Sequence, residues 1–260
     1  MLKNLVEAFC RHGDRLRHVT LLQGAKAYGS HLGPFRTPAR ESDPRHLPPN
    51  FYYDQEDWLR ERSSQAGFDF TVLRPPTVYG IAFGSPMNMT MVLAVYASIS
   101  KTLGRPLRFP GTDDAYRALR QGVDADLLAR AILWAGSTPH CAGRIYNVAN
   151  GDHYRWSQIW EVLARAFDMP LAEPQRIPPA EFMGAMGPIW HRLTEEHDLV
   201  PIPYENLVSW PFGESNFARG YDNVLCTLKI RQHGFSECTE TGRCWNDKSS
   251  ACAGKRIIPT

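Results

Sequence analysis

The feature that most constrains this chain is a strand, helix, strand order close to its start. The apolar run His18–Gln23 is typical of a buried strand in a parallel sheet, and Phe68–Leu73 is typical of a second one. Between them, Asn50 is a good helix cap, and the residues after it place apolar and aromatic side chains on one helical face. The pattern predicts an α/β fold with a buried parallel sheet. In such folds, ligands bind at the carboxyl ends of the strands.

Two residues with useful chemistry lie close to that edge in the sequence. Lys26 comes just after the first predicted strand, and Tyr52 stands at the start of the helix. A phenol has an ordinary pKa of about 10, so a tyrosine that acts near neutral pH needs a nearby cation, for which Lys26 is the candidate. The alternative is that Tyr52 and Tyr53 are ordinary amphipathic aromatics and Lys26 a solvated loop residue. Spacing alone favours this alternative, because the separation of Tyr52 and Lys26 defines no motif.

The wider pattern changes that balance, because several segments occur together in one order. They are Leu21–Gly29, Leu32–Phe35, Asn50–Asp57, Arg74–Gly80, Pro86–Asn88, Leu107–Gly111, Val123–Asp126 and Asn147–Asp152. In this combination they resemble the progesterone 5-beta-reductase and iridoid synthase-like family, an atypical branch of the extended short-chain dehydrogenases/reductases. No segment is specific alone. The resemblance runs from the first residues to about position 235.

The resemblance implies a catalytic pair. Ordinary short-chain dehydrogenases carry a Tyr-x-x-x-Lys signature on one helix, but here Glu56 stands at the lysine position. The family takes its lysine from an earlier Gly-x-Lys segment, which Lys26 matches, and its active tyrosine is the first of the pair, Tyr52. NADPH is the implied cofactor and a small apolar carbonyl compound the implied substrate. The implied cofactor contacts are Lys26, Tyr52, Pro75, Thr77 and Val78, and the implied substrate contacts are Phe35, Tyr53 and Asn88. Asn88 is also expected to form local hydrogen bonds.

The fold implied by the resemblance is a Rossmann-like doubly wound parallel sheet that lacks its first βα units, with a smaller, mainly helical substrate lobe. Residues 1–150 are expected to form the C-terminal part of the NAD(P)-binding domain. Residues 151–260 are expected to form the substrate-binding region, interleaved with the first. No Gly-x-x-Gly-x-x-Gly turn follows a strand in the sequence, so the turn that usually binds the cofactor pyrophosphate is missing. We therefore expect a chain that is N-terminally truncated relative to its family. The strand edge left unpaired would favour association, and a homodimer is one such form.

Composition excludes several other classes of protein. The chain has 260 residues, of which 43% are hydrophobic and 22% charged, as in ordinary globular proteins. A net charge of +2 gives no reason to expect nucleic acid or an anionic membrane as a partner. The longest apolar stretch, Met89–Ile99, is too short to span a bilayer, and no secretory signal is visible, so a cytoplasmic protein is expected. The six cysteines lack metal-ligand spacing, so no metal site is expected. They are expected to be reduced thiols, with a disulfide in the C-terminal tail as the alternative.

The remaining pattern predicts further elements. Helices are expected at 1–12, 87–103, 123–135, 156–167, 179–198 and 225–233, and short strands at 107–109 and 144–148. The segment 29–49, rich in Gly and Pro, is expected to form a long loop that walls the active site. The Cys-, Thr- and Ser-rich stretch after Phe235 is expected to be divergent or poorly ordered.

Three functions remain open on this basis. The first is an NADPH-dependent reductase of activated carbon–carbon double bonds, in which the Tyr52 phenol stabilises the developing enolate oxygen and Lys26 makes that phenol more acidic. The second is an extended short-chain dehydrogenase acting on an alcohol, a ketone or a nucleotide sugar. The third is a truncated, non-catalytic or partner-dependent fragment. The missing Tyr-x-x-x-Lys signature disfavours the second, and the family resemblance favours the first.

Overall fold

The computed structural model describes residues 1–12, 16–82 and 84–259. The chain forms two compact units, each built from three segments. Unit 1 comprises Met1–Pro76, Asp126–Ala149 and Asn223–Cys238; unit 2 comprises Thr77–Ala125, Asn150–Asp222 and Thr239–Thr260. The predicted division assigned residues 77–125 to the first domain, whereas the structure groups them with the second unit.

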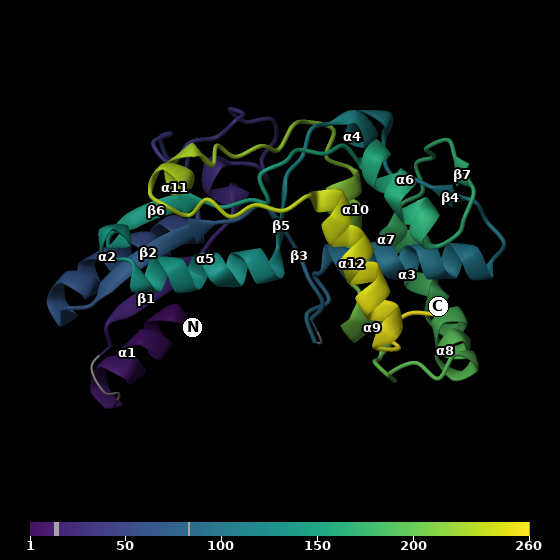
Figure 1. Cartoon of the computed structure of the whole chain (residues 1–260), viewed down its shortest axis with the longest axis horizontal. Helices are drawn as coiled ribbons and strands as arrows, with labels where there is room; N and C mark the ends of the chain where they lie inside the picture. Colours follow the sequence, from purple (N-terminus) through teal and green to yellow (C-terminus); the bar gives the residue numbers. More distant parts are fainter. Residues whose placement is uncertain (13–15, 83, 260) are drawn as a thin grey trace. The chain divides into compact units, whose positions relative to one another are not determined.

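Unit 1 is organised by a parallel sheet of three strands, labelled in Figure 1. Its strands are β1 (His18–Leu22), β2 (Asp69–Arg74) and β6 (Arg144–Asn147), in the order β1-β2-β6. The register pairs Leu21 with Val72 and Val72 with Ile145, so the same side of each strand faces one layer of helices. The strands predicted at His18–Gln23, Phe68–Leu73 and 144–148 are confirmed.

Helices cover both faces of this sheet. On one face, β1 and β2 pack through Leu21, Phe70 and Val72 against α1 (Leu2–His12) and α2 (Phe51–Ala66). On the other face lies α5 (Ala125–Ser137), whose Trp134 ring centre is 5.4 Å from that of Tyr146 in β6. Parallel strands with helices on both faces are the doubly wound α/β arrangement, so the predicted fold class is confirmed.

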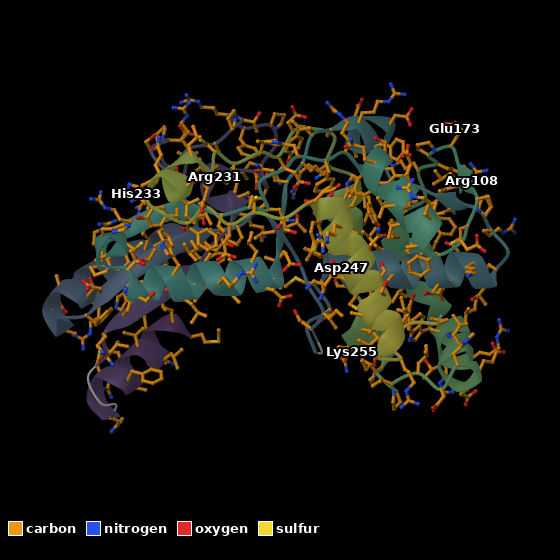
Figure 2. All side chains as sticks on the ribbon, in the orientation of Figure 1. Arg108, Glu173, Arg231, His233, Asp247 and Lys255 are labelled. Atoms are coloured by element: carbon orange, nitrogen blue, oxygen red, sulfur yellow. The ribbon has the colours of Figure 1, made fainter. Side chains whose placement is uncertain are left out.

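Unit 2 contains two further pairs of parallel strands. The first joins β3 (Thr77–Tyr79) to β5 (Gly122–Asp124), and the second joins β4 (Leu107–Arg108) to β7 (Leu171–Ala172). A Cβ atom at Gly122 would lie 2.1 Å from a ring carbon of Tyr79, so this strand contact requires glycine. Beside β4, the Arg108 guanidinium donates to the Glu173 carbonyl oxygen at 3.0 Å, and Figure 2 labels both residues.

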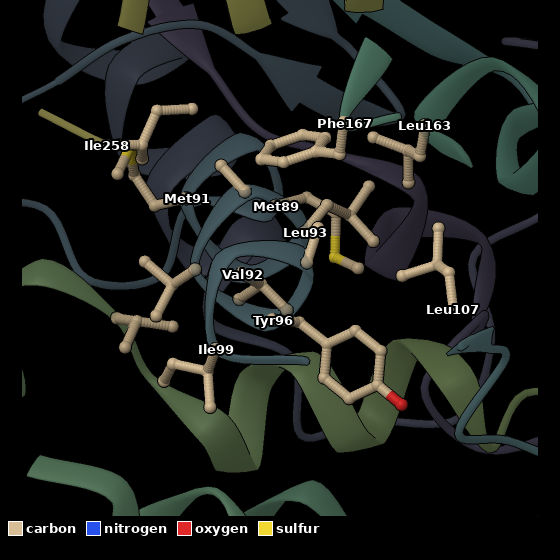
Figure 3. Packing of buried hydrophobic residues seen from close by; sticks show 14 of the residues in the cluster. Met89, Met91, Val92, Leu93, Tyr96, Ile99, Leu107, Leu163, Phe167 and Ile258 are labelled. Carbon is tan, nitrogen blue, oxygen red and sulfur yellow. The ribbon is translucent and has the colours of Figure 1, made fainter. Parts of the chain in front are cut away.

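The core of unit 2 is built around one mainly apolar helix, α3 (Met89–Thr102). Figure 3 shows its side chains, among them Leu93 and Tyr96, packed with Leu107, Leu163 and Phe167. A helix that is apolar nearly all round is buried on every side, and here residues 89 to 99 are all buried. The predicted helix at 87–103 is therefore confirmed.

The other helical elements complete the two units. They are η1 (Ala25–Tyr28), α4 (Asp113–Arg117), η2 (Pro139–Cys141), α6 (Trp156–Ala166), α7 (Pro179–Phe182), η3 (Gly184–Met186), α8 (Gly187–Glu196), α9 (Tyr204–Leu207), α10 (Trp210–Phe217), α11 (Leu228–Gln232) and α12 (Thr241–Gly254). The predicted helix at 179–198 is divided among α7, η3 and α8. Across the described ranges no helix is long and apolar enough to cross a membrane.

The stretch after Phe235 is ordered, so that half of the prediction is wrong, while its divergence stays a prediction. Residues 241–254 form the regular helix α12, and Cys244, Trp245 and Cys252 on it are buried in the unit 2 core. Composition misled here because Ser and Thr are usual in loops, whereas these cysteines are buried, and the Cys244 thiol also donates to the Asp124 carboxylate at 3.0 Å. All six cysteines of the chain are free thiols, as expected.

Candidate active site

The backbone of Tyr52 is fixed on both sides by hydrogen bonds. Tyr52 is the second residue of α2, and its amide donates to the Asn50 side-chain oxygen at 3.0 Å. Its carbonyl oxygen accepts a 2.8 Å hydrogen bond from the Gln23 side-chain amide, just after β1. Asn50 is thus the predicted N-cap, and together with Gln23 it ties the start of α2 to the carboxyl end of β1.

The Tyr52 hydroxyl lies at the carboxyl ends of two neighbouring strands. A Cβ atom at Gly24, which follows β1, would lie 3.6 Å from this hydroxyl oxygen and 3.4 Å from the carbonyl oxygen of Pro75, which follows β2. Within the described part of the chain the hydroxyl makes no hydrogen bond. Burial raises the pKa of the half-buried Tyr52 phenol above its ordinary value of 10, the opposite of the acidifying effect predicted for Lys26. Tyr52 is therefore a protonated donor at neutral pH.

Lys26 is held by its backbone and leaves its side chain exposed. It lies in η1, directly after β1, and its carbonyl oxygen accepts from the Asn50 side-chain amide at 3.0 Å and from the Gly29 amide at 3.2 Å. The Lys26 ammonium forms no ion pair with any described residue. The single side chain of Asn50 therefore connects the backbones of both predicted catalytic residues.

The hydroxyl of Tyr53, unlike that of the neighbouring Tyr52, is hydrogen-bonded within the protein. It is only 6% exposed, its hydroxyl donates to the Ala27 carbonyl oxygen at 2.9 Å, and it accepts from the His46 amide at 3.0 Å. The Arg45 guanidinium stacks on its ring at 4.7 Å. Tyr53 therefore has a structural role. Its substrate contact stays a prediction.

A buried polar network lies behind Tyr52, and sequence reasoning missed it. The Arg74 guanidinium donates to the Gln23 side-chain oxygen at 3.0 Å and to the Glu56 carboxylate at 3.0 Å. Arg74 is 5% exposed and Glu56 is 4% exposed. The sequence showed Glu56 only as the residue at the lysine position of the ordinary signature, without this burial and pairing. An acidic residue one turn after the tyrosine and an arginine ending the next strand were the available signal.

The end of β6 carries a second polar cluster that the sequence analysis did not anticipate. Asn147 is fully buried. Its side-chain oxygen accepts a 2.6 Å hydrogen bond from the Tyr28 hydroxyl, and its backbone amide donates to the Glu41 carboxylate at 2.8 Å. Burial raises the pKa of Tyr28 to about 12 and also raises the pKa of Glu41. The contacts of Glu41 and of Ala39, which bridges to Leu225, anchor the predicted long loop at 29–49 to the sheet.

The other predicted contact residues are divided between the two units. Phe35 is half-buried in unit 1, where it packs against the cluster of Ala25, Tyr28, Ala39 and Leu225. In unit 2, Thr77 and Val78 form part of β3. Asn88 caps α3 by accepting from the Thr90 amide at 2.9 Å and donates to the Gly80 carbonyl oxygen at 2.8 Å, which confirms its local hydrogen bonding. The cofactor and substrate contacts of these residues stay predictions.

Comparison with known proteins supports the predicted Rossmann-like fold and family resemblance. Residues 1–182 match the family described as "PRISE-like Rossmann-fold domain". An (S)-8-oxocitronellyl enol synthase of Camptotheca acuminata is 34% identical over 90% of this chain and 63% of its own length. Another from Nepeta cataria is 33% identical over the whole of this chain and 68% of its own length. The chain thus spans about two thirds of the length of these relatives.

Solved structures with low sequence identity share the fold. RMD of Pseudomonas aeruginosa, solved with NADPH, has a TM-score of 0.64 at 16% identity and covers 96% of this chain and 69% of its own. The UDP-glucose 4-epimerase of Thermotoga maritima, solved with UDP-glucose, has a TM-score of 0.61 at 17% identity and covers 96% and 67%. With the sequence relatives and the family match, these observations show that the chain belongs to the PRISE-like Rossmann-fold family, the progesterone 5-beta-reductase and iridoid synthase-like group that its motifs resemble.

Proposed function

We propose that this chain carries the catalytic tyrosine and lysine of an NADPH-dependent reductase of activated carbon–carbon double bonds. The observation that carries the proposal is the contrast between two adjacent phenols. The Tyr53 hydroxyl is committed to the backbone, whereas the Tyr52 hydroxyl is unpaired in the described structure and lies where both strands end. The relatives named as enol synthases support a reaction in which an enolate oxygen is stabilised.

Tyr52 would act as a neutral hydrogen-bond donor to the carbonyl oxygen of an enone or enal. As the β-carbon is reduced, negative charge develops on that oxygen, and a pre-positioned donor stabilises the charge more in the transition state than in the ground state. The raised pKa of Tyr52 keeps its proton in place at neutral pH. The exposed Lys26 ammonium would add positive charge at the same edge.

The donor groups at this edge fit one end of the proposed cofactor. NADPH, when bound, would supply the hydride. Lys26, Tyr52 and the Pro75 carbonyl oxygen would hold its nicotinamide–ribose end, because an exposed ammonium, an unpaired hydroxyl and a carbonyl oxygen at the end of β2 suit hydroxyl and amide groups. The sequence offers no Gly-rich turn for the pyrophosphate, so this end is the part of the site that the proposal concerns.

The position of Glu56 disfavours the alternative of an ordinary alcohol or nucleotide-sugar dehydrogenase. In that class the residue one turn after the tyrosine is the catalytic lysine. Here it is a buried carboxylate held by Arg74, which leaves no place for an ammonium on α2. Lys26 would have to act from η1 instead.

The test uses the purified chain, NADPH and a panel of small apolar enals and enones. NADPH binding is measured first by calorimetric titration, and turnover by loss of cofactor absorbance. Tyr52→Phe is expected to lower turnover by about 100-fold or more, the usual scale for a positioned proton donor, with NADPH affinity largely unchanged. The matched control is Tyr53→Phe, which removes the neighbouring hydroxyl and is expected to affect stability more than turnover.

Three results would overturn the proposal. Equal turnover of Tyr52→Phe and the unaltered chain would remove Tyr52 from the chemistry. Greater loss in Tyr53→Phe than in Tyr52→Phe, at equal stability, would assign the chemistry to the other phenol. Absence of NADPH binding by a folded sample would show that this chain does not carry the reaction by itself.

A further inference from the structure

Unit 2 contains a cavity that none of the predicted site residues lines. Its volume is about 400 Å³, within the range of small-molecule sites. Its walls come from four helices, α3, α6, α8 and α12, together with the segment at Ile258 and Pro259. Elements far apart in the sequence thus enclose one space, so the cavity belongs to the tertiary fold of the unit.

The base of the cavity is apolar. Phe167, Leu193 and Ile258 line it and are themselves almost completely buried in the unit 2 core. Figure 3 shows Phe167 and Ile258 in the packed cluster around α3. A ligand that fills this part must present an apolar body, since polar groups there would lose their hydration without compensation.

One wall is polar and has unused hydrogen-bonding groups. Asn246, Ser249 and Ser250 line the cavity from α12, at the spacing that places three side chains on one helical face. Ser249 is only 8% exposed, and no described residue hydrogen-bonds its hydroxyl. The Ser249 hydroxyl is therefore available to a molecule in the cavity, to which it can donate or from which it can accept a hydrogen bond.

The charge of the lining has one sign. Lys101 of α3 and His197, which follows α8, line the cavity and are exposed. Lys101 forms no ion pair within residues 1–12, 16–82 and 84–259, and no Asp or Glu is among the described lining residues. The cavity therefore combines an apolar base with a positive rim and neutral hydrogen-bond donors.

We propose that this cavity binds an amphipathic monocarboxylate, a small apolar molecule with a single anionic head. Its hydrocarbon part contacts Phe167, Leu193 and Ile258. Its carboxylate lies between the Lys101 ammonium and the hydroxyl and amide groups of Ser249 and Asn246, because charge-assisted hydrogen bonds are the strongest that such a lining can offer. The site is separate from the proposed chemistry of Tyr52 and does not depend on it.

The experiment is calorimetric titration of the full chain with octanoate, with octan-1-ol as the uncharged probe of equal chain length. Octanoate is expected to bind saturably with one site per chain, and more tightly than the alcohol. Lys101→Met keeps the apolar stem, removes the charge, and is expected to weaken octanoate binding by about tenfold, with little effect on the alcohol. The matched control is Lys255→Met, which removes a lysine at the end of α12 that is outside the lining (Figure 2).

A blocking variant keeps the proposal falsifiable. Ser250→Trp adds a large side chain from an exposed lining position, so the core needs no repacking, and it is expected to abolish octanoate binding. Binding that survives Ser250→Trp would place the ligand elsewhere and overturn the proposal. Equal weakening by Lys101→Met and Lys255→Met, equal affinity for acid and alcohol, or no saturable octanoate binding by the folded chain would do the same.

Discussion

The strand ends of unit 1 and the core of unit 2 hold their side chains in place by different means. Around Tyr52, three buried polar side chains, Gln23, Arg74 and Glu56, satisfy one another through directional hydrogen bonds. Around α3, side chains such as Leu93 pack without a polar group. Directional hydrogen bonds hold a side chain in one orientation, but they are costly when one partner is lost. Apolar packing tolerates substitutions that keep the volume of the side chain.

The largest expected effect comes from breaking the buried ion pair of unit 1. Arg74→Met removes the cation that faces Glu56 and the donor to Gln23, and leaves a buried carboxylate with only more distant guanidinium groups. Loss of one partner of a buried pair costs about 3–5 kcal/mol. The measurement is the free energy of opening of the β2 amides, from native-state hydrogen exchange.

Two controls show whether the ion pair is the cause. Arg108→Met removes a less buried guanidinium of unit 2 that donates to a carbonyl oxygen, and about 1 kcal/mol is expected. The double variant Arg74→Met/Glu56→Leu removes both charges and should recover part of the loss. A double variant less stable than Arg74→Met would mean that lost packing contacts, and not the carboxylate left without Arg74, explain the cost.

The next effect concerns the apolar region. Leu93 is fully buried in α3, so Leu93→Ala is expected to destabilise unit 2 by about 2–5 kcal/mol through lost contacts and a residual cavity. Leu93→Met keeps the volume and is expected to cost less than about 1.5 kcal/mol. Urea denaturation of both variants measures the difference. If Leu93→Met cost as much as Leu93→Ala, the core of unit 2 would require a precise shape, like the polar network of unit 1.

These two regions also differ in how far the sequence predicts them. The buried strands, the helix after Asn50 and the apolar helix α3 follow from periodicity and capping, which act locally. The pairing of Arg74 with Glu56 and Gln23 does not, because it depends on which strand lies beside which helix. The same limit explains the pairing of β4 with β7, which joins residues 107–108 to residues 171–172 and was not expected. Composition failed at α12 for a related reason, since burial turned its cysteines into core residues.

A matched pair of asparagines tests the link between stability and chemistry. Asn50 and Asn88 both cap a helix and both donate to a carbonyl oxygen earlier in the chain. Replacement of either by Ala is expected to cost about 1–2 kcal/mol, as for other N-caps. Only Asn50 joins the Lys26 backbone to that of Tyr52, so Asn50→Ala should also lower the turnover of any enal reduction.

The control for turnover is Thr112→Ala, which removes the cap of α4 and touches none of the predicted site residues. It should lower stability without changing the rate per folded molecule. With this control, Asn88→Ala tests the predicted contact between Asn88 and the substrate. A lowered rate for that variant at full folding would support the predicted substrate contact of Asn88, and an unchanged rate would leave Asn88 with its structural role alone.

The smallest effect is a shift in alkaline titration, and it sharpens the comparison between the regions. Burial raises the pKa of Tyr52 in unit 1, and it raises the pKa of Tyr96 in the unit 2 core to about 12. In both cases the folded chain holds the phenolic proton more tightly than the unfolded chain, whose tyrosines titrate at about 10. The resulting stability is fully present below pH 10 and is lost as pH rises through the folded pKa.

Difference spectra of the unaltered chain against Tyr52→Phe and Tyr96→Phe report the two phenolates. We expect both midpoints above 10. A Tyr52 midpoint below 10 would mean that Lys26 outweighs burial at the strand ends, as the resemblance implies, and that the two regions differ in how they set the pKa of a tyrosine.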